Sequence, residues 1–210
     1  MSKLVIIGAR AMRRETCSYA RECGMGVKGF LDSKTDALDG FTGYPPIFDS
    51  VENYTPEEDD VFVVALGESK PRREYASIIA AKGGRFISVI HPSAIIGDNV
   101  QIGEGCIVCP GAVIGNDAKI GNHCIIGVQS LVAHDCVLED FVSISPGCHI
   151  AGGCKMGEGV FFGIHSAAVP KLVIGNDVFV GAGAVVTKSF ESGKLVGIPA
   201  HNILSGGISA

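Results

Sequence analysis

The stretch that decides the fold is IIGDNVQIGEGCIVCPGAVIGNDAKIGNHCIIGV, residues 95–128. An aliphatic or otherwise apolar residue returns in it every six positions, and the register continues without an insertion from Ile96 to Val186. The series consists of Ile96, Ile102, Val108, Ile114, Ile120, Ile126, Val132, Leu138, Ile144, Ile150, Met156, Phe162, Ala168, Ile174, Val180 and Val186. In a chain that is 47% hydrophobic, chance would break such a series within a few steps, so the repeat is structural.

Each six-residue unit predicts a short strand followed by a turn. Three units would close a triangular coil of 18 residues with the apolar position inside, and about five coils would stack at roughly 4.8 Å. The residue after the apolar position is usually glycine, which we expect to allow positive φ at the corners. These glycines are Gly97, Gly103, Gly115, Gly121, Gly127, Gly157, Gly163, Gly175 and Gly181.

Five of the eight cysteines occupy the small position two residues before the apolar one. They are Cys106, Cys124, Cys136, Cys148 and Cys154. The spacing of 18 residues between Cys106 and Cys124 would bring this pair within disulfide reach on adjacent coils, and the same holds for Cys136 and Cys154. We expect buried thiols that act as small apolar groups, because a reducing compartment keeps them free. No zinc-type pair of CxxC motifs is present, and no metal is expected.

Residues 1–90 follow a different pattern, in which short apolar runs alternate with helical stretches. The apolar runs are residues 3–8, 27–32, 60–67 and 85–90, and the helical stretches are residues 11–24 and 71–84. This alternation predicts a parallel sheet covered by helices, and therefore a Rossmann-like domain over 1–90 ahead of a repeat domain over 91–210. The segment 33–60, rich in Asp, Gly and Pro, predicts a loop with little regular structure that borders a ligand.

Charge and the first residues narrow the class of partner. The net charge of −5 without a basic run argues against nucleic acid, whose phosphates need clustered Lys and Arg. The start MSKLVIIGA is neither a signal peptide nor a membrane span. We therefore expect a cytoplasmic protein that binds small molecules.

The repeat pattern [LIV]-G-x4 resembles that of left-handed β-helix proteins, many of which are acyltransferases. With the α/β half in front and the ending VGIPAHNI at residues 196–203, the chain resembles the PglD/NeuD-type sugar O- and N-acyltransferase family over nearly its whole length. The resemblance implies a Rossmann-like sugar-nucleotide-binding domain followed by a left-handed parallel β-helix, and a homotrimer. It further implies transfer from acetyl-CoA to an amino group of a nucleotide-linked amino sugar for bacterial surface glycans.

The most specific local match is SLVAHDCVLEDFVSISPG, residues 130–147. On that match His134 is the general base and Asp135 is the carboxylate that fixes its tautomer. The residue types suit the chemistry, because a thioester is already reactive and the attacking amine mainly needs to lose a proton to an imidazole. The alternative is a solvated histidine on a polar turn. His123 and His165 are rival bases, and His149 and His201 are weaker ones because no acidic residue follows them.

The resemblance also assigns binding residues. The acetyl-CoA set is Ser143, where the family often has a histidine, with Gly152, Ile164 and Ala182. The acceptor set is Gly8, Arg10, Ala11, Met12, Asp32, Ser33 and Gly67.

The first βα turn departs from a dinucleotide fingerprint. It reads GARAMRRE, residues 8–15, and lacks GxGxxG, so NAD or FAD binding is unsupported. Arg10, Arg13 and Arg14 either add positive charge for an anion at the helix N-terminus or form a solvated helix face.

Three other functions stay open on the sequence. The first is O-acetylation of a sialic acid-type sugar. The second is a non-catalytic nucleotide-binding trimer with the β-helix as scaffold. The third is a metalloenzyme with His123, His149 and His165 at a subunit interface.

Overall fold

The computed structural model describes residues 2–197. Its N-terminal α/β part is a five-stranded parallel sheet in the order β3-β2-β1-β4-β5. The strands are β1 (Lys3–Ile7), β2 (Val27–Leu31), β3 (Ile47–Asp49), β4 (Asp60–Val64) and β5 (Arg85–Phe86). This is the strand order of a doubly wound sheet, so the predicted Rossmann-like fold is confirmed. The prediction of little regular structure over 33–60 missed β3, which forms the edge of the sheet.

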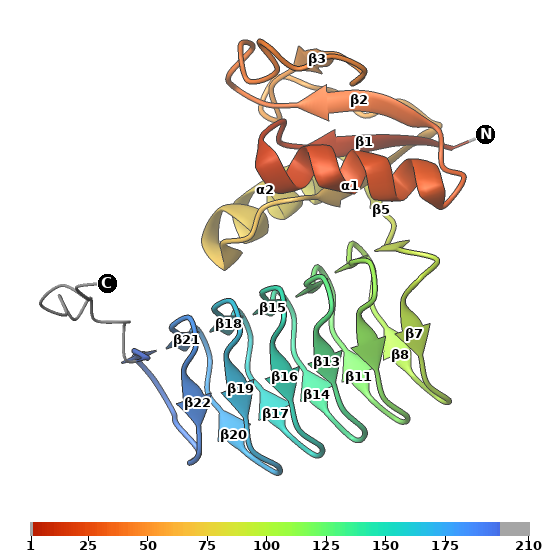
Figure 1. The fold of residues 1–210 in the computed structure, drawn as a ribbon. Coiled ribbons are helices and arrows are strands. Elements are labelled where there is room, and N and C mark those ends of the chain that lie inside the picture. Colours follow the sequence, from red (N-terminus) through yellow and green to blue (C-terminus); the bar gives the residue numbers. More distant parts are fainter. Residues whose placement is uncertain (1, 198–210) are drawn as a thin grey trace, which may run out of the picture.

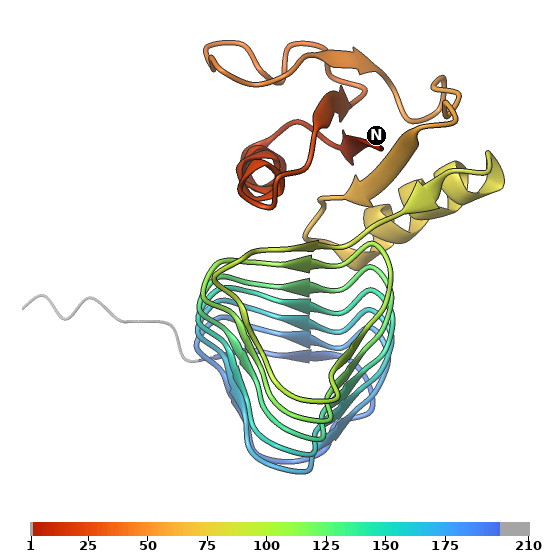
Figure 2. The ribbon, with the colours of Figure 1, turned by 90° about the vertical axis from the view of Figure 1, so that its right-hand side faces the viewer.

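Two helices cover opposite faces of this sheet (Figures 1 and 2). They are α1 (Ala11–Glu22) and α2 (Ser69–Ala81). Side chains of β1 alternate between the two faces, as the period of a strand requires. Leu4 and Ile6 pack in the α1 layer with Cys17, whereas Val5 and Ile7 pack in the α2 layer. β1 is therefore buried on both sides.

The rest of the described chain winds into a parallel β-helix with three flat faces (Figures 1 and 2). The first face has β6 (Val89–Ile90), β9 (Ile107–Val108), β12 (Ile125–Ile126), β15 (Ser143–Ile144), β18 (Phe161–Phe162), β21 (Phe179–Val180) and β23 (Lys194–Leu195). The second face has β7 (Ile95–Ile96), β10 (Val113–Ile114), β13 (Leu131–Val132), β16 (His149–Ile150), β19 (Ala167–Ala168) and β22 (Val185–Val186). The third face has β8 (Gln101–Ile102), β11 (Lys119–Ile120), β14 (Val137–Leu138), β17 (Lys155–Met156) and β20 (Val173–Ile174).

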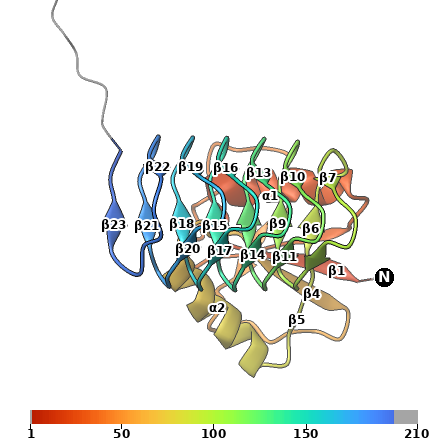
Figure 3. The ribbon, with the colours of Figure 1, turned by 90° about the horizontal axis from the view of Figure 1, so that it is seen from below.

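The α/β part lies on the first face, as the views in Figures 2 and 3 show together. Ile107 and Ile125 of that face are buried in the same cluster as Leu4 and Ile6 of β1 and residues of α1. The two parts thus share one apolar layer.

The apolar series of the repeat fills the interior of the β-helix. Residues such as Ile114, Ile126 and Phe162 are completely buried. Ile96, at 39% exposed, and the half-buried Ile102 are the exceptions, because they lie in the first coil and no earlier coil covers them. The predicted inward position is confirmed.

The glycine after each apolar residue has a different role from the one predicted. None of the nine has positive φ. A Cβ on Gly121 would instead lie 2.7 Å from the backbone N of Asp140 on the next coil, and one on Gly115 would lie 2.6 Å from that of His134. Positive φ falls two residues later, at Asp117 and Asp135 among others. Close approach between coils, and not conformation, therefore requires these glycines.

All eight cysteines are free thiols, and the five inward ones also make hydrogen bonds. The Sγ of Cys106 donates to the carbonyl of Gly121 at 3.0 Å, and that of Cys148 donates to Gly163 at 3.0 Å. Ser130 makes the corresponding bond to Ser145 at 2.8 Å. The thiols satisfy corner carbonyls as well as filling space.

Membrane-spanning helices and metal-binding clusters are both absent from the described residues. No helix within 2–197 is long and apolar enough to cross a membrane. Over the same range, no group of three or more His, Cys, Asp or Glu side chains is arranged to hold a metal ion.

Cys148 offers a test of this packing. Cys148→Ser should change the free energy of unfolding by less than about 1 kcal/mol, because serine keeps the donor. Cys148→Leu should lower it by about 1–3 kcal/mol through overpacking. Chemical denaturation under reducing conditions measures both, and an equal loss in the two variants would contradict the hydrogen-bonding role.

Candidate functional site

His134 and Asp135 form a pair at the edge where the second face turns into the third, between β13 and β14. His134 Nδ1 lies 2.7 Å from Asp135 Oδ2, and the two side chains are 69% and 65% exposed. A carboxylate at this distance accepts the Nδ1 proton and leaves the Nε2 lone pair free. The pair therefore presents a basic nitrogen to the outside of the β-helix.

The backbone under this pair is held by the coils on either side. The N–H of Asp135 donates to the carbonyl of Asn116 at 3.0 Å, and the carbonyl of His134 accepts from Gly153 at 2.9 Å. Asp135 has φ 59°, a left-handed conformation that aspartate adopts more readily than most residues. The β ladder thus fixes where the pair stands.

Gly152 lies one coil beyond His134 and directly beside its ring. A Cβ on Gly152 would be 2.6 Å from both Nε2 and Cε1 of His134. The absence of a side chain there is what lets the imidazole occupy its present place. The structure therefore brings Gly152, which the resemblance assigned to the acetyl-CoA set, next to the His134–Asp135 pair.

The rival histidines are placed differently. His123 is buried between the rings of Phe86 and Phe141, with centroids 4.7 and 5.0 Å away. Burial, helped by the charge of Arg72, lowers the pKa of His123 to about 4. It is a packed neutral ring and not a base facing solvent. His149 and His165 are exposed, and His201 lies outside the described residues.

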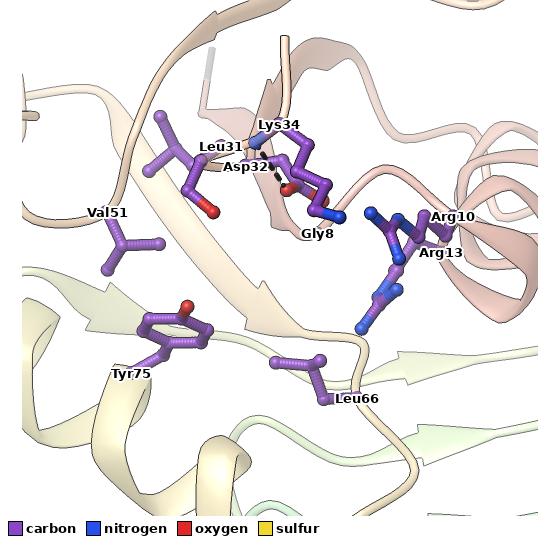
Figure 4. A pocket seen from close by; sticks show the side chains of 10 residues that line it. Gly8, Arg10, Arg13, Leu31, Asp32, Lys34, Val51, Leu66 and Tyr75 are labelled. Carbon is purple, nitrogen blue, oxygen red and sulfur yellow. Dashed lines mark hydrogen bonds between the residues drawn. The ribbon is translucent and has the colours of Figure 1, made fainter. Parts of the chain in front are cut away.

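A cleft in the α/β part collects several predicted acceptor residues (Figure 4). It measures about 200 Å³ and opens where β1, β2 and β4 end, which is where doubly wound sheets bind ligands. Its lining consists of Gly8, Arg10, Arg13, Leu31, Asp32, Ser33, Lys34, Val51, Leu66 and Tyr75. Gly8, Arg10, Asp32 and Ser33 are thus brought together as predicted.

The cleft has a cationic side and an apolar side. Figure 4 shows Arg10, Arg13 and Lys34 facing the cleft on one side, with Val51 and Tyr75 on the other. A Cβ on Gly8 would lie 2.4 Å from Arg13 Nε, so glycine lets Arg13 fold over the β1–α1 turn. Lys34 lies in the 33–60 segment that was expected to border a ligand, although it was not singled out there. Tyr75 was missed by the sequence analysis, because it comes from α2 and no local pattern marks it.

Asp32 stabilises the rim of this cleft. Its Oδ2 accepts from the backbone N–H of Ala9 at 2.9 Å and its Oδ1 accepts from that of Lys34 at 3.0 Å. The carboxylate joins the first βα turn to the loop after β2. Ala11, which does not line the cleft, begins α1 with φ 24°.

Met12 and Gly67 line a second chamber, between α1 and the first face of the β-helix. This chamber of about 190 Å³ is mainly apolar and also contains Ser143 and Phe161. A further hollow, lined by Arg13, Leu66, Gly67 and Phe161 among others, shares residues with both. We refer to the three neighbouring spaces at the end of β4 as one groove, because Leu66 and Gly67 each line two of them.

Ser143 is enclosed within the chain. It is 3% exposed, its Oγ donates to the carbonyl of Gly67 at 2.7 Å, and it accepts from Arg72 at 2.8 Å. Arg72 was not anticipated from the sequence. Ile164 and Ala182 are exposed on the edge between the first and second faces, and Gly152 lies on the edge between the second and third. The predicted cofactor residues are thus divided between different edges.

The histidine pair and the cleft do not meet within one chain. The α/β part covers the first face, whereas His134 stands on the edge shared by the other two faces (Figures 1 and 2). A site that used both would need a second copy of the chain.

The chain matches two known protein families and is similar to sugar-nucleotide N-acetyltransferases. Residues 3–79 match the family described as PglD N-terminal domain, and residues 87–116 match the bacterial transferase hexapeptide repeat. GDP-perosamine N-acetyltransferase of Escherichia coli is 31% identical over 187 residues, which cover 85% of this chain and 82% of the relative. UDP-N-acetylbacillosamine N-acetyltransferase of Bacillus subtilis is 34% identical over 82 residues, 37% of each chain.

Solved structures agree over nearly the whole chain. The acetyltransferase domain of PglB from Neisseria gonorrhoeae in complex with acetyl coenzyme A has a TM-score of 0.85 at 30% identity, covering 96% of this chain and 98% of that one. PerB from Caulobacter crescentus in complex with CoA and GDP-perosamine has a TM-score of 0.84 at 29% identity, covering 96% and 97%.

The contact between Gly152 and His134 can be tested. Gly152→Ala should leave the fold intact, because the exposed imidazole can swing away, and should displace that ring from its place. Changed NMR signals of the His134 imidazole, assigned with a His134→Gln variant, would show the displacement. An unchanged ring signal would contradict the packing described here.

Proposed function

The chain belongs to the family of sugar-nucleotide N-acetyltransferases that combine a PglD N-terminal domain with hexapeptide repeats, and from this premise we propose that it acetylates the amino group of a nucleotide-linked amino sugar with acetyl-CoA. The observation that carries the proposal is the His134–Asp135 pair with its ring over Gly152. The relatives crystallised with acetyl-CoA, CoA or GDP-perosamine support it.

In the proposed mechanism, Nε2 of His134 takes a proton from the acceptor nitrogen as that nitrogen attacks the thioester carbonyl. Asp135 holds the Nδ1 proton and stabilises the imidazolium that forms. The tetrahedral oxyanion is stabilised by backbone N–H groups of the β-helix. Its collapse breaks the C–S bond, and the CoA thiolate leaves with the proton that His134 had taken. The reaction needs no covalent intermediate on the protein.

We also propose that the enzyme is a homotrimer joined through the second face. The outward row on that face is Ile95, Val113, Leu131, His149, Ala167 and Val185. On the third face the corresponding row is Gln101, Lys119, Val137, Lys155 and Val173. The second face is the more apolar of the two, and an exposed apolar face of this kind marks a contact with another protein.

Cyclic packing through this face would complete the site. When identical prisms pack around an axis parallel to their length, unlike edges of neighbouring copies meet. The edge with His134 and Gly152 then faces the next copy's edge with Ile164 and Ala182, and acetyl-CoA lies between them. That second edge borders the first face, so the next copy's α/β part would deliver the acceptor.

The division of labour follows from this arrangement. We assign residues 1–90 to acceptor binding, through Gly8, Arg10, Asp32 and Ser33 in the cleft and Met12 and Gly67 in the chamber. Ala11 contributes by starting α1. We assign residues 91–210 to acyl transfer.

Release of free thiol from acetyl-CoA tests the activity directly. The wild-type chain should release thiol with one or more GDP- or UDP-linked amino sugars and not with plain nucleotide sugars. Release only with hydroxyl acceptors such as free sialic acids would make it an O-acetyltransferase. If the chain shows neither turnover nor CoA binding, the non-catalytic scaffold function would be favoured.

The catalytic pair has a matched control one coil earlier. His134→Ala should reduce kcat by at least about 100-fold, and Asp135→Ala by about 10-fold. Asp117 occupies the same corner position one coil earlier, with φ 61°, so Asp117→Ala should retain full activity. Steady-state kinetics compare the three. Near-normal turnover of His134→Ala would remove it from the mechanism.

The trimer prediction uses two similarly exposed valines on different faces. Val185→Glu, at 63% exposure on the second face, should produce monomers and abolish turnover. Val173→Glu, at 56% exposure on the third face, should leave the trimer intact. Light scattering after size-exclusion chromatography gives the mass. A trimeric Val185→Glu variant would contradict packing through the second face.

A further inference from the structure

Arg72 is a fully buried arginine that joins the α/β part to the β-helix. It lies on α2, and its guanidinium donates to the carbonyls of Leu66 and Gly67 from one nitrogen and to Phe141 and Ser143 from the other. All of these acceptors are neutral. Burial lowers the pKa of Arg72 to about 10, so the group stays charged at neutral pH.

Ser143 closes a triangle with Arg72 and Gly67. Arg72 donates to the Ser143 Oγ at 2.8 Å and to the Gly67 carbonyl at 2.9 Å, and Ser143 donates to that same carbonyl at 2.7 Å. Three elements meet here, namely α2, the end of β4 and β15. Ser143 has one hydroxyl proton, and it donates that proton to the Gly67 carbonyl of the same chain.

This triangle fixes Leu66 and Gly67, which form one wall of the acceptor groove, the Leu66–Gly67 wall. Leu66 lines both the cationic cleft and the adjoining hollow, and Gly67 lines that hollow and the apolar chamber. These two residues follow the carboxyl end of β4, where the chain would otherwise be an ordinary exposed loop. The Gly67 carbonyl instead accepts directly from Ser143 of the β-helix, and the Leu66 carbonyl is connected to the β-helix through Arg72.

We propose that Arg72 and Ser143 are positioning residues for the acceptor, which fix the Leu66–Gly67 wall at a set height above the β-helix. This role rests on the proposed function. It differs from the acetyl-CoA contact that the family resemblance implies for Ser143, because the hydroxyl is 3% exposed and already donates its one proton to Gly67, so it has no proton left to donate to the cofactor.

An arginine suits this task better than a lysine. The planar guanidinium presents donors in a fixed fork and reaches carbonyls on two separate segments at once. A lysine is a point charge on a flexible stem. The orientation of the wall therefore depends on the fork as well as on the charge.

The neighbouring arginine provides a matched control. Arg73 also lies on α2 and also reaches the β-helix, through ion pairs of 2.8 Å each with Glu158 and Asp177. It does not contact Leu66 or Gly67 by any hydrogen bond among the described residues. Arg73→Ala therefore removes a tie between the two parts without releasing the wall.

The test separates the two substrates kinetically. Ser143→Ala and Arg72→Lys should each raise the KM for the amino-sugar nucleotide about tenfold, with the KM for acetyl-CoA unchanged. Ser143→Cys keeps a weak donor and should give an intermediate value. Arg73→Ala should stay within about twofold of wild type for both substrates. Calorimetry with UDP, GDP and CoA alone should show the same split, and thermal unfolding and light scattering check each variant.

Four results would overturn the role. A raised KM for acetyl-CoA with the acceptor unaffected would make Ser143 a cofactor contact. Equal effects in Arg73→Ala would reduce Arg72 to general attachment of the two parts. If the wild-type chain binds CoA and every variant keeps the wild-type nucleotide affinity, the positioning role is refuted and the proposed function stands. If the wild-type chain binds neither CoA nor nucleotide, the proposed function fails and this role fails with it.

Discussion

The parallel ladder in which each residue pairs with the one 18 positions further along is the constraint on which the rest of the structure depends. It requires apolar side chains inside, and it requires glycine where a corner of one coil runs against the next. The same ladder gives the proposed catalytic pair its setting, since a backbone hydrogen bond from Asp135 to the Asn116 carbonyl and one from Gly153 to the His134 carbonyl hold the corner that carries His134. An exposed imidazole on an ordinary loop would lack this support. Here its position is inherited from the repeat.

Features governed by the repeat were predictable, and features that depend on distant segments were not. The inward position of Ile114 and the nearness of Gly152 to His134 both follow from counting in sixes. The reason for Gly115 was predicted wrongly, because the sequence does not reveal whether a glycine is needed for conformation or for close approach. Arg72 lies 71 residues from Ser143, and their contact exists only after the α/β part has docked on the first face. Lys34 and Tyr75 meet within the α/β part itself, but they come from a loop and a helix with no periodic signal.

The division of the site has a chemical consequence. In the proposed mechanism the base and the acceptor cleft of one chain lie apart, so neither half would act alone. Two docking events would then set the reacting distance, namely the packing of the α/β part on its own β-helix and the proposed packing of one β-helix against the next. The first is stabilised by the buried layer around Ile107 and Ile125 and by Arg72. The second would involve the apolar row that includes Leu131 and Val185. Small errors in either would change the position of the acceptor nitrogen, since orientation contributes a large share of an enzyme's rate.

The attachment at Ser143 divides the coils into two classes with different freedom to change. Coils from Val89 to Ser143 act as a measured spacer, because they separate the junction with β5 from the point where Arg72 is anchored. Adding or deleting one 18-residue unit there would move the anchor by about 4.8 Å and separate the guanidinium from Phe141 and Ser143. Coils beyond Phe161 carry no such attachment to Arg72, but they carry Ile164, Ala182 and Val185 of the proposed cofactor edge and trimer face. Addition of coils at the C-terminal end should therefore be tolerated, whereas shortening would remove these residues.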